Sequence, residues 1–274
     1  MPEQLSVDVG DTRLHTERWP GDGPTVILLH AGICDLRSWR ATAELLAPLT
    51  VVAYDRRGFG SSPGPDGEFR HVDDLHRVLD AVSPNDPAVL VGSSMGGGVA
   101  LDLAVSAPDR VSALVLLAPA VSGAPDVEEV DADTQRLGDL LDKAMDGGDN
   151  DEVNRLEMWL WLDGPTAPEG RVGGAARALA LEMNAALLSR GESEHGGASG
   201  IDAWQSLEEV RVPTTVSCGD LDLPFFLDRC REIARRVPNA DYTPLPGMAH
   251  LPYLEDPQQV ARLLTRAVAR ASDD

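Results

Sequence analysis

A serine between two glycines is the residue of this chain whose surroundings best suit nucleophilic chemistry. Residues 92–96 read Gly-Ser-Ser-Met-Gly; they follow a short apolar run and precede a segment that suits a helix. A serine held in a tight turn needs neighbours without side chains two positions to either side, and Gly92 and Gly96 meet that need. The backbone N–H of Met95 would then face the same space as the Ser94 hydroxyl. This spacing predicts a nucleophile and an oxyanion donor on one turn.

A serine hydroxyl is a poor nucleophile near neutral pH and needs a base, normally a histidine that a carboxylate orients. Of the six histidines, His250 is the best candidate, because it lies in the loop after the last predicted strand. A base above the edge of a sheet would occupy such a loop. Four other histidines lie in segments that suit a hairpin, a surface helix or a polar loop, and we expect them to be solvated or structural: His15, His71, His76 and His195.

The acid that orients this histidine should lie in a loop after a strand, between the serine and the histidine. Residues 218–224, Cys-Gly-Asp-Leu-Asp-Leu-Pro, follow such a strand and contain two carboxylates, Asp220 and Asp222. Aspartate also often stabilises a turn or caps a helix without taking part in chemistry. The residues alone therefore leave both aspartates as candidates.

The elements that must position these residues alternate between strands and helices. The predicted strands are residues 5–9, 13–19, 25–29, 51–54, 89–93, 111–117, 212–218 and 241–245, and the predicted helices are residues 36–46, 72–82, 99–107, 225–236 and 257–271. Such alternation implies right-handed crossovers and a parallel sheet. We therefore expect an α/β fold, with a mostly parallel eight-stranded sheet and helices on both faces.

The alternation stops between residues 122 and 206, where the sequence shows no convincing strand. Helical patterns occur there instead, at residues 127–145, 152–162 and 174–188. We interpret residues 122–206 as a helical cap over the carboxyl edge of the sheet. Residues 1–121 and 207–274 then form the core.

Together these motifs resemble those of α/β-hydrolase-fold serine hydrolases with a helical cap, over residues 5–121 and 207–272. That family has the chain order serine, acid, histidine, and its acid usually lies in a Gly-x-x-Asp turn. The resemblance implies that Gly219 is the glycine and Asp222 the acid. Asp220 would then have a turn or capping role.

Residues 30–33, His-Ala-Gly-Ile, resemble the family's His-Gly-x motif, whose third residue donates its backbone N–H to the oxyanion. The resemblance implies that Gly32 completes the oxyanion hole with Met95. Ala31 replaces the usual glycine, so Ile33 is the alternative donor.

The resemblance implies hydrolysis of a small-molecule carboxylic ester, lactone or thioester through an acyl-enzyme on Ser94, with Asp222 and His250 completing a triad. Relatives that open epoxides or displace halide have aspartate at the elbow. Cyanohydrin-cleaving relatives use an active-site lysine, whereas Lys143 lies in the predicted cap. Carbon–carbon bond hydrolases usually have an aromatic residue where this chain has Leu251. A carbon–carbon hydrolase, a non-hydrolytic lyase or cyclase, and a ligand-binding protein on this fold are the alternatives.

We expect four apolar residues to line the substrate site: Ile33, Trp159, Met183 and Leu251. Two of them, Trp159 and Met183, occur at near-helical spacing in the predicted cap, together with Met158, Trp161 and Leu187. Packing of the cap on the core is the competing interpretation of this set. The cysteines match no metal-ligand pattern, and we expect neither a metal nor a cofactor.

Acidic residues outnumber basic residues by 45 to 23, and the net charge of −22 repels nucleic acid and anionic membranes. We therefore expect a small, neutral or apolar ester-like partner, with no nucleic acid and no membrane. The three cysteines are widely spaced and the first residues are polar and acidic, which suits a cytoplasmic protein. We expect a monomer or a homodimer.

Overall fold

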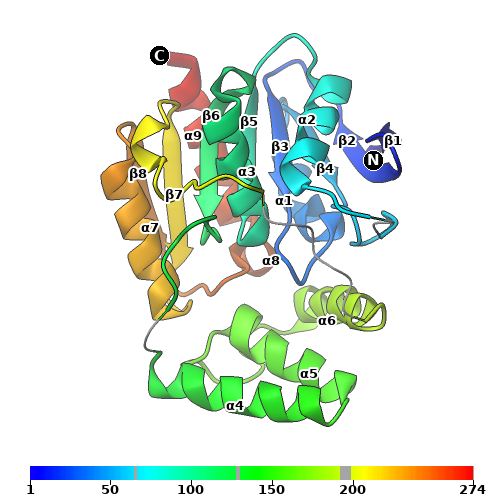
Figure 1. The fold of residues 1–274 in the computed structure, drawn as a ribbon, viewed down its shortest axis with the longest axis vertical. Coiled ribbons are helices and arrows are strands. Elements are labelled where there is room, and N and C mark those ends of the chain that lie inside the picture. The colour runs from blue at the N-terminus through cyan, green and yellow to red at the C-terminus, as the bar shows by residue number, and fades with distance from the viewer. Residues whose placement is uncertain (65–66, 128–129, 192–198, 274) are drawn as a thin grey trace.

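The computed structural model describes residues 1–64, 67–127, 130–191 and 199–273, and its centre is one eight-stranded sheet (Figure 1). The strand order is β1-β2-β4-β3-β5-β6-β7-β8. The pairs β1–β2 and β2–β4 are antiparallel and the other five pairs are parallel, which confirms the predicted mostly parallel sheet. The strands are β1 (Glu3–Asp8), β2 (Arg13–Trp19), β3 (Thr25–Leu29), β4 (Thr50–Tyr54), β5 (Ala88–Ser93), β6 (Val111–Leu117), β7 (Thr214–Gly219) and β8 (Ala240–Leu245).

Buried side chains of the central strands point alternately into two hydrophobic clusters, one on each face of the sheet. In β3, Ile27 and Leu29 belong to one cluster, whereas Val26 and Leu28 belong to the other. Successive side chains of a strand project to opposite faces, so a strand that is covered on both faces needs a continuous apolar run. This requirement explains the composition of β3.

Helices cover both faces, as predicted. Side chains of α2, α3 and α7 belong to the first cluster, and side chains of α1, α8 and α9 belong to the second. These helices are α1 (Arg40–Ala43), α2 (His71–Val82), α3 (Met95–Ser106), α7 (Pro224–Arg236), α8 (Pro252–Glu255) and α9 (Pro257–Asp273). Short 3-10 turns occur at Leu36–Trp39, Pro108–Arg110 and Leu207–Glu209.

The prediction of one continuous helix over residues 36–46 is wrong. The chain forms a 3-10 turn at Leu36–Trp39, then only the four residues of α1. After α1, the N–H groups of Leu45 and Leu46 bond three residues back rather than four, and Pro48 has no N–H with which to continue a helix. The helix is therefore short because its last turn tightens and then stops.

Three further helices lie together at the end of the sheet toward which the arrows of β6 and β7 point (Figure 1). They are α4 (Ala132–Asp146), α5 (Asn150–Glu157) and α6 (Gly174–Leu188), and a π-helical turn, Met158–Asp163, directly follows α5. Within the described part of residues 122–206 there is no strand. We keep the name cap for this segment, as an interpretation of its position.

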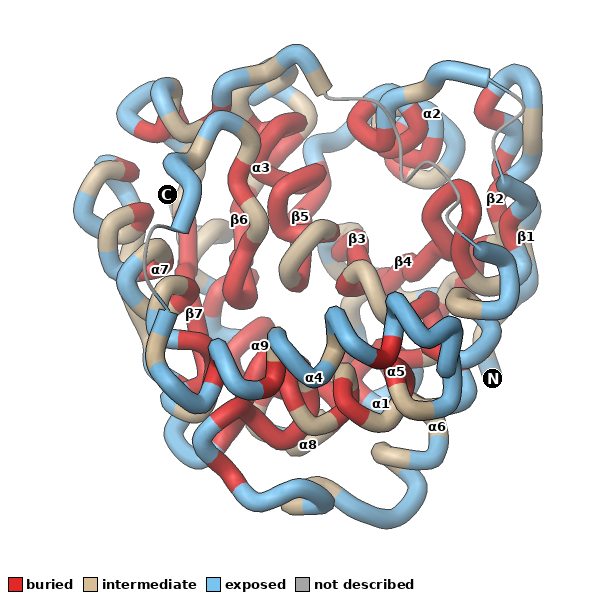
Figure 2. Tube along the Cα trace, turned by 60° about the horizontal axis from the view of Figure 1, so that its bottom comes forward, coloured by how far each residue is buried: buried red, intermediate tan, exposed pale blue. Residues whose placement is uncertain are grey.

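The start of α4 differs from the predicted start of a helix at residue 127. Asp131 caps the helix, because its carboxylate accepts hydrogen bonds from the N–H groups of Asp133 and Thr134. Figure 2 shows exposed residues along much of α4, whereas β5 and β6 behind it are largely buried. In the portion of the chain that the structure describes, we find no helix with the length and apolar character needed to cross a bilayer.

Candidate active site

Ser94 occupies the turn between β5 and α3, in a backbone conformation that residues with side chains rarely adopt. Its φ is 50° and its ψ is −118°. Such strain persists only where the surroundings impose it. Here the Ser94 N–H donates to the carbonyl of Leu117 (2.9 Å), and the Ser94 carbonyl accepts from Gly98 (3.1 Å) and Ala120 (2.9 Å). The turn therefore has the form of a nucleophile elbow, with Ser94 itself half-buried.

The glycines of this turn are required by close backbone approaches. A Cβ atom on Gly96 would lie 2.5 Å from the carbonyl oxygen of Leu29 and 2.6 Å from that of His30, both at the end of β3. A Cβ atom on Gly92 would overlap the carbonyl of Gly96. Glycine thus allows the first turn of α3 to pack directly against β5 and the loop after β3.

His250 and Asp222 are joined by a short hydrogen bond. The Nδ1 atom of His250 lies 2.8 Å from Asp222 Oδ2, and both side chains are buried. The other carboxylate oxygen, Oδ1, accepts from the N–H of Leu223 at 2.7 Å. Asp220, in contrast, is exposed and accepts from the N–H of Gly247 at 2.6 Å. Of the two candidate acids, Asp222 is therefore the one that the structure places against the histidine.

The loops that carry this pair pack against each other. The N–H of Leu221 donates to the carbonyl of Met248 at 2.9 Å. A Cβ atom on Gly219 would overlap the carbonyl oxygens of Met248 and Ala249. The glycine at the end of β7 therefore lets the histidine loop come close enough for the hydrogen bond between the two side chains.

The sheet register brings this carboxylate–imidazole pair to the same edge as Ser94. Ser93, the last residue of β5, pairs with Leu117 of β6, and Leu117 pairs with Ser217 of β7. β8, which precedes the histidine loop, pairs with β7 in parallel as well. Because the four strands are parallel, the loops that follow them all leave the same edge of the sheet. Nucleophile, base and acid, as the sequence predicts them, lie in loops of this edge.

Two aromatic residues hold the imidazole of His250. Its ring centroid lies 4.8 Å from that of Trp161 and 4.5 Å from that of Phe226. The backbone N–H of His250 also donates to the carbonyl of Trp161 at 3.2 Å. Phe226 is not among the predicted site residues, and Trp161 belongs to the set of cap residues from which the sequence prediction selected Trp159. The sequence could have indicated Phe226, because it lies only four residues after Asp222, in the first turn of α7.

The side chain of Met95 lies close to Gly32, the other residue that is predicted to donate to the oxyanion. A Cβ atom on Gly32 would lie 3.4 Å from the terminal methyl carbon of Met95. Behind them, Arg56 donates from Nη2 to the carbonyls of His30 (3.1 Å) and Ala31 (3.2 Å). Complete burial, with the Arg56 charge nearby, lowers the pKa of His30 well below its usual value, so the ring is neutral. His30 therefore supports the loop rather than acting as a base.

The predicted substrate-site residues have mainly packing contacts. The indole N–H of Trp159 donates to the carbonyl of Ala167 (2.9 Å), and the Arg136 guanidinium lies 4.8 Å from its ring centroid, so its contacts are within the cap. Met183 and Leu251 are buried in one cluster, and Ile33 packs against it half-buried. Their contact with substrate stays a prediction.

Arg171 connects the cap to the histidine loop. Its guanidinium donates to the carbonyls of Leu162 (2.8 Å) and Asp163 (2.7 Å) at the end of the π-helical turn. It also donates to the carbonyl of Gly247 (2.9 Å) and forms an ion pair with Glu255 (2.6 Å). The other oxygen of Glu255 accepts from the N–H of the residue before His250 at 2.7 Å. The Arg171 guanidinium thus connects the π-helical turn of the cap to the loop that carries His250.

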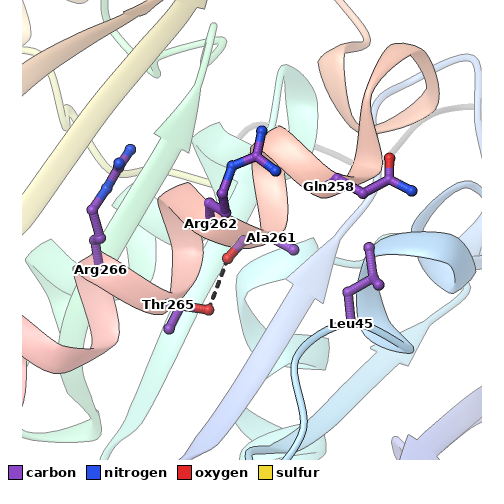
Figure 3. A pocket seen from close by; sticks show the side chains of 6 residues that line it. All are labelled: Leu45, Gln258, Ala261, Arg262, Thr265 and Arg266. Carbon is purple, nitrogen blue, oxygen red and sulfur yellow. Dashed lines mark hydrogen bonds between the residues drawn. The ribbon is translucent and has the colours of Figure 1, made fainter.

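A hollow of about 470 Å³ lies elsewhere, between α9 and the end of α1 (Figure 3). Figure 3 shows its lining residues: Leu45, Gln258, Ala261, Arg262, Thr265 and Arg266. None of the predicted catalytic residues lines it. Among the residues the structure describes, no three His, Cys, Asp or Glu side chains are grouped to hold a metal ion. His195 lies outside the described residues.

Comparisons with known proteins agree with this architecture. The chain is 40% identical over 112 residues to lipase LipV of Mycobacterium tuberculosis, a match that covers 40% of this chain and only 42% of the lipase. It is 25% identical over 275 residues to a Bacillus subtilis protein provisionally named 2-succinyl-6-hydroxy-2,4-cyclohexadiene-1-carboxylate synthase, covering 95% and 96% of the two chains. A serine hydrolase from Cycloclasticus zankles has the same fold, with a TM-score of 0.77, 21% identity and complete coverage of both chains.

The family model for alpha/beta hydrolases matches residues 26–263, which include β3 except its first residue, all of β4 to β8, and the predicted serine, acid and histidine. The chain therefore belongs to the alpha/beta hydrolase family.

Proposed function

We propose that this protein hydrolyses small-molecule carboxylic esters, including lactones or thioesters, through an acyl-enzyme on Ser94. The observation that carries the proposal is the buried hydrogen bond between His250 Nδ1 and Asp222 Oδ2, 2.8 Å long, at the sheet edge that also holds the strained elbow of Ser94. Serine esterases need this combination, because an unassisted hydroxyl is too weakly nucleophilic to attack an ester.

In the proposed reaction, Nε2 of His250 takes the hydroxyl proton as Ser94 Oγ attacks the carbonyl carbon. The N–H groups of Met95 and Gly32 bind the oxyanion of the tetrahedral intermediate. Asp222 stabilises the imidazolium, which then gives its proton to the leaving alcohol. A water molecule releases the acyl group by the same route, and the serine is regenerated.

The surroundings of the base support this role. Trp161 and Phe226 contact the imidazole, and the side chain of His250 is only 3% exposed. Exclusion of water strengthens the electrostatic interaction of an imidazolium with its carboxylate. The same apolar walls favour an apolar group next to the reacting ester, and the net charge of −22 disfavours anionic substrates.

The test is covalent labelling combined with turnover. A fluorophosphonate probe should attach to Ser94 of the wild-type protein, as identified by mass spectrometry of the modified peptide. The Ser94→Ala variant should lose labelling, and its kcat for p-nitrophenyl butyrate should fall by about four to six orders of magnitude. Near-normal ester hydrolysis by Ser94→Ala would contradict the proposal.

A lyase or cyclase is the second candidate, because a relative that matches almost the whole chain is the provisionally named synthase. Such chemistry would use Ser94 and His250 for proton transfer without an acyl-enzyme. Turnover of a substrate that leaves no trapped serine adduct under rapid quenching, while the probe still labels Ser94, would favour this candidate. A cytoplasmic location, and a monomer or homodimer, stay predictions.

A further inference from the structure

A second hollow, of about 290 Å³, borders the elbow. One face of α3 lines it with Met95, Gly98, Val99 and Asp102, which are spaced by three and four residues and therefore share one side of the helix. Its other walls are residues 120–122, after β6, the start of α2, and Ser199, which precedes β7. Since Met95 is the expected oxyanion donor, the hollow begins at the proposed active site.

The wall formed by residues 120–122 is fixed to the elbow, because the N–H of Ala120 donates to the carbonyl of Ser94 at 2.9 Å. None of the residues that line this hollow comes from the histidine loop or from β7 and β8. In the proposed reaction the leaving alcohol must lie beside His250, which protonates it. The hollow on the α2 and α3 side is therefore placed to receive the acyl arm of the ester.

A buried carboxylate, Asp102, lines this hollow, which has three other polar lining residues, His71, Ser122 and Ser199. The residue is only 4% exposed. Its Oδ2 accepts from the Ser122 hydroxyl at 2.9 Å. Its Oδ1 has no hydrogen bond of ordinary geometry within the described residues, although the Ser199 hydroxyl is near enough to lower the carboxyl pKa. The larger effect is burial, which raises that pKa.

No arginine, lysine or histidine forms an ion pair with Asp102 within the described chain. A buried carboxylate that is only partly hydrogen-bonded is costly, and buried polar groups without full partners often occur at functional sites. From Met95 to Asp102 the helix rises by about 10 Å, at about 1.5 Å per residue. A ligand group that reached Asp102 would thus lie about 10 Å from the reacting carbonyl.

We propose that Asp102 is a specificity residue that binds a hydrogen-bond donor at the far end of the acyl chain, preferably an ammonium group. The inference rests on the proposed ester hydrolysis and names its substrate class: esters of acids with an apolar chain and a terminal amine or hydroxyl. An ammonium group supplies the countercharge that the carboxylate lacks. The strongly negative net charge also favours a cationic substrate over an anionic one.

The test compares p-nitrophenyl octanoate with the 8-hydroxy and 8-amino derivatives, whose extended chains span about the rise of α3 between the two residues. For the wild-type protein, kcat/KM for the amino ester should exceed that for the octanoate by about 10- to 100-fold, with the hydroxy ester between them. Equal rates, or a preference for the unsubstituted chain, would overturn the proposal.

The Asp102→Asn variant keeps the shape of the side chain and removes its charge. Its preference for the amino ester over the octanoate should fall to within about threefold. Asp109→Asn, which removes one exposed charge outside the hollow, is the matched control and should retain the wild-type preference. The preference is a ratio within each variant, so it is insensitive to the fraction of folded protein. An unchanged ratio in Asp102→Asn would refute the role of this carboxylate.

Two further measurements separate this inference from the proposed function. Val99→Phe, which fills the hollow, should lower kcat/KM for the amino ester more than it lowers kcat/KM for p-nitrophenyl acetate; equal effects on both would refute an acyl site here. Calorimetry on Ser94→Ala needs no turnover, and it should show tighter binding of 8-aminooctanamide than of octanamide. If esters are not hydrolysed but this binding difference is found, the proposed subsite at Asp102 is supported and the proposed ester hydrolysis is contradicted. If the two amides bind equally, the proposed subsite is contradicted.

Discussion

Replacement of Arg171 by methionine tests whether the cap holds His250, the proposed catalytic base, in position. The guanidinium contacts three backbone carbonyls and the carboxylate of Glu255. The side chains are 22% and 5% exposed, respectively. Breaking a fully buried ion pair costs about 3–5 kcal/mol, and an exposed pair contributes about 0–1 kcal/mol. For this partly exposed pair we expect Arg171→Met to lower the free energy of unfolding by about 2–3 kcal/mol.

The loss should depend on pH. Burial raises the pKa of Glu255, and removal of the neighbouring cation should raise it further. A carboxyl group whose pKa is raised by folding loses its stabilising contribution as the pH rises through that pKa. Urea unfolding should therefore show a larger difference between Arg171→Met and wild type at about pH 8 than at about pH 5.

Arg171→Met should lower kcat by more than destabilisation of the cap alone would. Without Arg171, the carbonyl of Gly247 and the carboxylate that holds the residue before His250 lose their support. Displacement of a catalytic group by about 1 Å can lower the rate about 100-fold, and we expect kcat to fall by about that factor with little change in KM. The downfield proton NMR signal of the hydrogen bond between His250 and Asp222 should broaden or vanish.

Arg177 provides the matched control. It pairs with the carboxylate of Asp163 at 2.7 Å and donates to the carbonyl of Val172 at 3.4 Å, so its contacts remain within the cap. Arg177→Met should destabilise the protein while it preserves the NMR signal and a kcat within about threefold of wild type. If both variants lose kcat and the signal equally, or if neither does, the reasoning about Arg171 is refuted.

Three other predictions follow from the site and its support. Asp222→Asn should lower kcat by about 10⁴-fold, whereas Asp220→Asn should change it by less than about tenfold; equal effects in steady-state assays would reject the assignment of the acid. Burial raises the pKa of Asp55 from 3.8 to about 7, so the stability its neutral form contributes is lost as the pH rises from about 4 to about 7. Wild type should lose stability relative to Asp55→Asn between about pH 5 and about pH 8 in urea unfolding, and parallel curves would contradict this. Gly96→Ala should abolish fluorophosphonate labelling, because its Cβ would collide with two carbonyls of the loop after β3; full labelling of a folded variant, checked by circular dichroism, would disprove it.

Strands, helices and turns that depend on residues near one another in the chain could be predicted closely from the sequence. The predicted bounds of β2, β3, β6 and α6 coincide with those in the structure. Continuous apolar runs mark strands that are buried on both faces, and glycine spacing marks a turn that admits no side chain. Such constraints act within a few residues, so they can be read without knowledge of the tertiary fold.

The choice between the two aspartates needed more than the residues themselves. Asp220 and Asp222 occupy one turn after β7, and only the family resemblance favoured the second. In the structure, the hydrogen bond from Leu221 to Met248 sets how the acid loop lies against the histidine loop, and Asp222 Oδ2 then faces His250. That contact joins segments that are distant in the chain, so no local pattern contains it.

What the sequence by itself determined is the set of reactive residue types, their order along the chain and the strands whose ends carry them. The tertiary structure decided which side chains surround the base. The sequence prediction chose Trp159 from the cap, whereas the π-helical turn brings Trp161 against His250 and leaves Trp159 bonded within the cap. No sequence pattern could have predicted the role of Arg171, because three of its partners are backbone carbonyls. Every residue has a carbonyl, and only folding determines which of them lie near Arg171.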